Sequence, residues 1–217
     1  MATTTPNYGW TVPTSTDLVK DGATAIETLG DAIDASMNTA LGTKKAGMVL
    51  LNTTSFSGVT SQSINDVFSA TYDNYLILVD GINSTTSAQL LTLRMRASGS
   101  DNSSSNYRWS MGYQRDNTAT PAFVGEGSNG TSTSFNLAGL SSTAGYYSPV
   151  TVQLKNPFSS TKQTGYNFAN YYYDQFGTIG YSFTGSGAMT VTTSYTGFTI
   201  ICSNNMTGSV SVYGYNK

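Results

Sequence analysis

Histidine is absent from the 217 residues of this chain, and cysteine occurs only once, as Cys202. Without histidine, neither a Ser-His-Asp catalytic triad nor a zinc site built on histidine can form. A single cysteine excludes a disulfide within the chain. Because Cys202 lies in the apolar run FTIIC, we expect it to be a small buried side chain. A glycine-rich phosphate loop with its lysine is missing as well.

Charge is also scarce. Charged residues make up 10% of the chain and the formal net charge is −2, so the sequence shows no basic footprint for nucleic acid. No apolar run is long enough for a signal peptide or a membrane-spanning helix. We therefore expect no membrane insertion, and a chain that is made in a cytoplasm and not exported by a signal of its own. Glycine and hydroxyl-bearing residues take the place of charge and predict a neutral surface.

Residues 14–45 are the one segment with a convincing helical pattern. Apolar residues recur at steps of three and four, which places them on one stripe of an amphipathic helix. In heptad terms the a-like residues are Val19, Ile26, Ile33 and Ala40, and Leu29 is d-like. Residues 15–17 offer N-caps, and the lysines at 44 and 45 suit the C-terminal end.

A helix of this length is marginal in water unless its apolar stripe is buried. The stripe packs either on the β-region of the same chain or on copies of itself in a short parallel bundle. The remainder of the chain favours the bundle, with Val19, Ile26, Leu29 and Ile33 at its seam.

The leader MATTTPNYGWTVP precedes this helix. It is polar, contains two prolines and cannot form a core alone. Exposed aromatic residues in such a segment, here Tyr8 and Trp10, usually dock on a partner surface. The alternative, which the sequence leaves open, is that Trp10 packs against the following helix.

From Met48 onward the apolar period changes from 3.6 to 2. Leu91, Leu93 and Met95 alternate with polar residues, as in a half-buried strand. About eight to ten such strands, separated by Gly, Asn and Ser turns, predict a mainly β fold with an antiparallel β-sandwich. We therefore divide the chain into residues 1–47 and a β-head of residues 48–217. The first part has five acidic residues against three lysines, whereas the head has seven charges of each sign.

Carboxylate pairs are the remaining catalytic option, as in a glycan-cleaving enzyme. The head contains seven carboxylates: Asp66, Asp73, Asp80, Asp101, Asp116, Glu126 and Asp174. None belongs to a recognisable motif, so we predict no catalytic residue, no resident metal and no cofactor. A calcium loop at residues 101–103 (Asp-Asn-Ser) is an alternative, although such loops are common.

Aromatic residues among Asn, Ser and Thr are typical of sugar-binding surfaces, because a ring stacks on the sugar while hydroxyl groups form hydrogen bonds. The predicted glycan-binding residues are Tyr107, Trp109, Tyr171, Tyr172 and Tyr173; Tyr113, Tyr146 and Tyr147 are further candidates. The alternative for each is a place in the core or in a subunit interface, since about half of the aromatic residues in a strand face inward.

The segment YGWTVPTSTDLVKDGATAIETLGDAIDASM resembles the N-terminal part of many bacteriophage tail-fibre and minor tail proteins. The stretches SINDVFSATYDNYLILVDGI and LRMRASG resemble the start of the β-sandwich head of the same proteins, notably of the cyanophage and actinophage type. The resemblance covers residues 8–45 best and residues 64–100 next.

This resemblance implies a non-enzymatic homotrimer in the virion tail. A three-helix bundle and the leader, including Tyr8 and Trp10, would attach it to other tail or baseplate proteins. Three jelly-roll-like heads would bind a polysaccharide on the host surface. The alternatives are a purely structural virion protein, such as a capsid decoration or baseplate fibre, and a glycan depolymerase.

Overall fold

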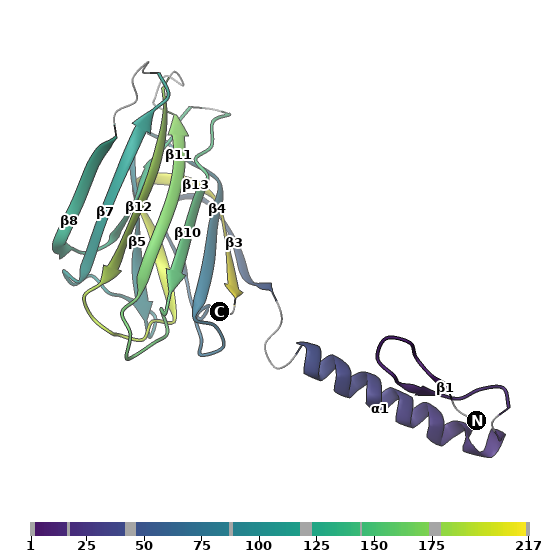
Figure 1. The fold of residues 1–217 in the computed structure, drawn as a ribbon. Coiled ribbons are helices and arrows are strands. Elements are labelled where there is room, and N and C mark those ends of the chain that lie inside the picture. Colours follow the sequence, from purple (N-terminus) through teal and green to yellow (C-terminus); the bar gives the residue numbers. More distant parts are fainter. Residues whose placement is uncertain are drawn as a thin grey trace. The chain divides into compact units, whose positions relative to one another are not determined.

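The computed structural model describes residues 3–16, 18–41, 47–86, 89–117, 123–143, 145–173 and 179–215. Within these residues the chain forms two compact units, 1–46 and 47–217, each described by itself. The fold is mainly β with one N-terminal α-helix, as predicted (Figure 1). Asp17, Lys44 and Lys45, assigned above to the helix ends, and Asp174 lie outside the described residues.

In the first unit, the leader folds into a small hairpin that packs on the helix. Strands β1 (Thr3–Thr4) and β2 (Thr11–Val12) pair antiparallel. Trp10 is half-buried, and its indole Nε1 donates a hydrogen bond of 2.9 Å to Ser36 Oγ on the helix. The ring of Tyr8 stacks on Trp10, with 5.1 Å between ring centroids. Of the two interpretations of Trp10, the structure therefore shows the one in which it packs on the helix.

The helix begins later than the sequence pattern predicts. A 3₁₀ turn, η1, spans Val19–Asp21, and helix α1 spans Gly22–Leu41. Leu18 is extended, with φ −68° and ψ 134°, and its apolar side chain cannot cap the first turn. The expected start near Thr14 is thus wrong, because helical geometry is established only after Leu18.

The second unit is the β-head. Its strands are β3 (Met48–Ile64), β4 (Asn74–Ser84), β5 (Gln89–Ala97), β6 (Ser100–Asp101), β7 (Tyr107–Arg115), β8 (Val124–Ser132), β9 (Phe135–Leu140), β10 (Val150–Lys155), β11 (Gly165–Tyr173), β12 (Gly180–Met189) and β13 (Gly197–Tyr215). The order is β6-β5-β13-β4-β10-β11-β12-β7-β8, with β3 also on β13 and β9 also on β5. All of these pairs are antiparallel, and the sheet curls into the predicted sandwich (Figure 1).

Strand β13 belongs to both layers of the sandwich. Residues 197–202 pair with β5, whereas residues 206–215 pair with β4. Strand β3 follows β13 on its other side, and their register shifts between Ile201 and Met206, where β13 changes partner. One long strand pair thus connects the two layers.

Alternating apolar residues of the strands fill the core. Ile77 and Val79 of β4 and Leu91 and Met95 of β5 are fully buried, in agreement with the period of two. Cys202 is buried as predicted.

The pairing registers define two ends of the head. Met48, where the chain enters the head, pairs with Tyr215, and we call this the entry end. Tyr173 pairs with Gly180, and Tyr181 with Arg115, at the opposite end of β11, β12 and β7. We call this the far end.

Candidate functional site

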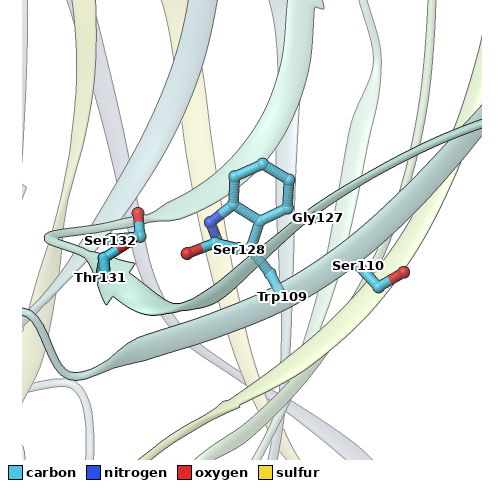
Figure 2. Close-up of a pocket in the computed structure, with 6 residues that line it drawn as sticks. All are labelled: Trp109, Ser110, Gly127, Ser128, Thr131 and Ser132. Carbon is cyan, nitrogen blue, oxygen red and sulfur yellow. The ribbon is translucent and has the colours of Figure 1, made fainter.

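A pocket of the head lies beside Trp109, near the edge of the sheet. It has a volume of about 740 Å³, and it is lined by Trp109, Ser110, Gly127, Ser128, Thr131 and Ser132 of β7 and β8. Figure 2 shows Ser128, Thr131 and Ser132 on the side of the indole that carries its nitrogen. Since β8 is the last strand of the order, nothing pairs beyond it within the described sheet.

The strands next to Trp109 leave space for its indole. Trp109 pairs with Ser128 on β8 and with Gly187 on β12. A Cβ atom at Gly187 would lie 2.0 Å from the carbonyl oxygen of Arg108 and 2.8 Å from Trp109 Cα, so this position requires glycine. With a small residue on either side, the half-buried indole faces no large cross-strand neighbour.

Two polar atoms of the pocket lack a partner among the described residues. The indole Nε1 of Trp109 and the Oγ of Ser128 are both buried and form no hydrogen bond there. A buried polar group without a partner costs about 1–3 kcal/mol. By contrast, Ser132 Oγ donates to the carbonyl oxygen of Ser134 at 2.7 Å. Both atoms belong to residues that line the pocket, so a shift of either side chain would present an N–H donor or a hydroxyl to a bound molecule.

The chemistry of the pocket suits a neutral polyhydroxyl ligand. An indole ring can pack on the C–H face of a sugar, while N–H and O–H groups bind its hydroxyls. None of the six lining residues carries a charge. The lining thus holds no group that would pair with a carboxylate or an ammonium.

The structure corrects two of the predicted glycan-binding residues. Tyr107 and Tyr172 have exposed fractions of 0% and 8%. The Tyr107 hydroxyl accepts a hydrogen bond from Met95 N at 3.0 Å and donates one to the carbonyl oxygen of Asn102 at 2.7 Å. Burial raises the pKa of Tyr107 well above its ordinary value. Both rings face the interior, so the prediction that they bind sugar is wrong.

The other two predicted tyrosines lie apart from Trp109. Tyr171 and Tyr173 are half-buried at the far end of β11, where Tyr171 pairs with Ser182. Trp109 pairs with the same strand at Gly187, toward the entry end. The structure therefore does not bring the five predicted residues into one site. Ser128, which the sequence analysis missed, carries no signal of its own in this serine-rich chain.

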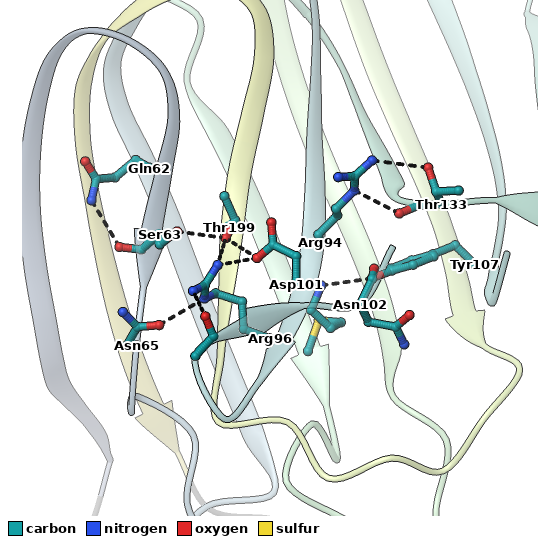
Figure 3. A network of polar contacts seen from close by, with 12 residues as sticks. Gln62, Ser63, Asn65, Arg94, Arg96, Asp101, Asn102, Tyr107, Thr133 and Thr199 are labelled. Atoms are coloured by element: carbon teal, nitrogen blue, oxygen red, sulfur yellow. Dashed lines mark hydrogen bonds and ion pairs between the residues drawn. The ribbon is translucent and has the colours of Figure 1, made fainter. Parts of the chain in front are cut away.

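The residues of the alternative calcium loop serve the fold instead. Asp101 forms an ion pair with Arg96 and accepts a hydrogen bond of 2.7 Å from the hydroxyl of Thr199 (Figure 3). Asn102 Oδ1 accepts a hydrogen bond of 3.0 Å from the backbone N–H of Ser104. Across the described ranges, no group of three or more His, Cys, Asp or Glu side chains could hold a metal ion.

The N-terminal unit leaves part of its apolar stripe exposed. Val19 and Ile26 have exposed fractions of 96% and 66%, whereas Leu29 and Ile33 are half-buried. Leu29 lies two turns before Ser36, on the face that receives Trp10. Tyr8 is exposed, but Trp10 contacts its own helix, so of the predicted attachment pair Tyr8 is the more accessible.

Comparisons with family models, characterised proteins and solved structures find no match to this chain. Among the helical residues described, no helix is long and apolar enough to cross a membrane.

Proposed function

We propose that this chain is a non-enzymatic tail-fibre protein of a bacteriophage virion, whose β-head binds a neutral glycan on the host surface. The observation that carries this proposal is the Trp109 pocket. The indole of Trp109 and Ser128 line it together, neither the indole Nε1 nor the Ser128 Oγ has a hydrogen-bond partner among the described residues, and no lining residue is charged. The sequence resemblance to tail-fibre proteins supplies the setting in which a glycan is the ligand.

The exposed stripe of α1 supports a homotrimer. Exposed residues of η1 and α1 recur at steps of four and three: Val19, Ala23, Ile26 and Gly30, with Met37 two turns further on, whereas Ile33 is half-buried like Leu29. With Val19 and Ile26 at d positions and Gly30 at an a position, this stripe is an alternative to the heptad register that the sequence alone favoured. Leu29, which belongs to the seam in that first register, is half-buried on the face that Trp10 covers. In this proposal the exposed stripe is the seam of a three-helix bundle.

Three identical heads would compensate for a weak site in each. An open pocket contributes a modest affinity, and linked sites raise the overall affinity without any new contact. The exposed Tyr8 beside the helix would contact a tail or baseplate protein, and the chain would reside in the tail of the virion.

The test is binding of the intact chain to surface polysaccharide from candidate host cells. We expect Trp109→Ala to weaken binding at least about tenfold, equivalent to about 1.4 kcal/mol. Trp109→Phe keeps a ring but removes the N–H, so its affinity for the polysaccharide should lie between those of the wild type and Trp109→Ala. Ser57→Ala on exposed β3 is the matched control.

Unchanged binding by a folded Trp109→Ala variant would contradict the pocket. A wild-type chain that joins virions but binds no polysaccharide would instead identify a purely structural virion component. Release of reducing sugar by the wild-type chain would identify a depolymerase.

A further inference from the structure

We propose a second saccharide-binding site at the far end of the head, formed by Asp116, Tyr146, Tyr147, Tyr171 and Tyr173. The Asp116 carboxylate would accept hydrogen bonds from neighbouring sugar hydroxyls, and the tyrosine rings would pack on the sugar faces. The inference rests on the proposed function only in that the ligand is a glycan, since none of these residues lines the Trp109 pocket.

Three separate segments bring Asp116, Tyr146, Tyr171 and Tyr173 to one place, and the exposed Tyr147 follows Tyr146 in the chain. Asp116 directly follows the last residue of β7. Tyr171 and Tyr173 are among the last three residues of β11. Tyr146 precedes β10, and its ring contacts Tyr173 with 4.6 Å between centroids. Tyr171 and Tyr173 contact each other edge to face at 5.3 Å. A row of three rings thus runs from the carboxylate to the segment before β10.

The carboxylate is held in a fixed orientation while remaining exposed. Asp116 Oδ1 accepts a hydrogen bond of 2.8 Å from the backbone N–H of Gly180, and Oδ2 accepts one of 3.0 Å from the Tyr171 hydroxyl. Each carboxylate oxygen has a second lone pair, so the group can accept further bonds from a ligand. A carboxylate that is already oriented loses little entropy on binding.

Gly180 permits this arrangement. A Cβ atom there would lie 2.0 Å from Tyr171 Oη and 2.3 Å from Asp116 Oδ2. Any side chain at this position would displace the hydroxyl or the carboxylate. The close contact is thus built into the backbone of β12.

The surrounding surface favours sugar over a strictly apolar partner. Tyr146 and Tyr147 have exposed fractions of 37% and 54%. Each ring ends in a hydroxyl. Hydrogen bonds with the side chains of Tyr173 and Asp116 raise the pKa of Tyr171, so its hydroxyl stays protonated, and with its proton donated to Asp116 it can accept a hydrogen bond from a ligand. Arg115 lies over the rings of Tyr113 and Tyr181, at 5.9 and 5.4 Å, on the other face of the sheet from Tyr171 and Tyr173. Rings, hydroxyls and one oriented carboxylate match the C–H faces and hydroxyls of an oligosaccharide.

The experiment uses the intact chain and a printed array of neutral and acidic oligosaccharides. The variants are Asp116→Asn, Tyr147→Ala and Gly180→Ala at the far end, and Trp109→Ala at the pocket. Gln114→Ala, an exposed neighbour on β7 outside the row of rings, is the control. Circular dichroism establishes that each variant is folded. If Gly180→Ala unfolds, Tyr147→Ala still tests the site, because it removes only an exposed side chain.

We expect Asp116→Asn and Tyr147→Ala each to weaken binding of at least one array oligosaccharide about tenfold, with Gln114→Ala unchanged. A loss confined to Trp109→Ala overturns the second site and leaves the proposed function standing. A loss confined to the far-end variants supports the second site and contradicts the pocket. An array that the wild-type chain does not bind at all overturns both.

Discussion

At the scale of the residue, two aromatic side chains of one strand differ in their burial. Tyr107 and Trp109 are two apart on β7 and share a parity, so the sequence pattern treats them alike. Phe135 of β9 packs against Tyr107, at 4.9 Å between centroids, and Tyr107 is fully buried. Trp109 instead lines an open pocket. The alternation predicted which residues share a face, but it could not predict how far β9 covers that face.

The first residue-scale prediction concerns Tyr107. Tyr107→Phe removes both hydrogen bonds of the hydroxyl and leaves the N–H of Met95 buried without that partner. We expect the free energy of unfolding in urea to fall by about 1–3 kcal/mol, with glycan binding unchanged. Tyr147→Phe, at an exposed ring, should change stability by less than about 0.5 kcal/mol. Loss of glycan binding in folded Tyr107→Phe would reinstate the original assignment.

The second concerns pH. Burial raises the pKa values of Tyr75, Tyr107 and Tyr166 in the folded head. Because the folded pKa exceeds the unfolded value of about 10, this contribution to stability is complete below pH 10 and is lost as the pH rises above it. We expect alkaline unfolding in which tyrosinate absorbance and loss of near-ultraviolet circular dichroism rise together. If all fifteen tyrosines titrate near their ordinary pKa while the fold stays intact, the predicted coupling of tyrosine ionisation to unfolding is contradicted.

At the scale of the element, the helix was predictable in kind but not in its contacts. Its period of three and four was plain in the sequence, yet the face that stays exposed depends on the leader. Once Trp10 binds Ser36, the covered face includes Leu29, and the exposed stripe shifts by part of a turn toward Ile26. A hydrogen bond between residues 26 positions apart leaves no periodic signal in the sequence.

The element-scale prediction tests the seam. Ile26→Asp places a charge in the exposed stripe, where burial of an unpaired carboxylate is costly. We expect sedimentation equilibrium to show three-chain mass for the wild type and one-chain mass for the variant. Thr28→Asp adds the same charge away from the stripe and should leave the trimer intact. Equal masses for wild type and Ile26→Asp would contradict the bundle.

At the scale of the whole molecule, the division of roles between two units gives a prediction about avidity. The head contains its own core, so residues 47–217 should fold alone. We expect this fragment and the intact chain to bind a soluble oligosaccharide equally. On a polysaccharide-coated surface, the fragment should bind about 10²–10⁴-fold more weakly, because the proposed trimer would present three heads and the fragment only one. Surface plasmon resonance on both formats measures the ratio, and a ratio near one would contradict the trimer.

The long pairing of β3 with β13 has a mechanical consequence. Tension that enters the head at Met48 pulls along the axis of β3, while its hydrogen bonds to β13 run across that axis. The hydrogen bonds are therefore loaded together, in shear, and do not break one after another. A head loaded at Met48 would therefore resist forced unfolding far better than its equilibrium stability alone would indicate.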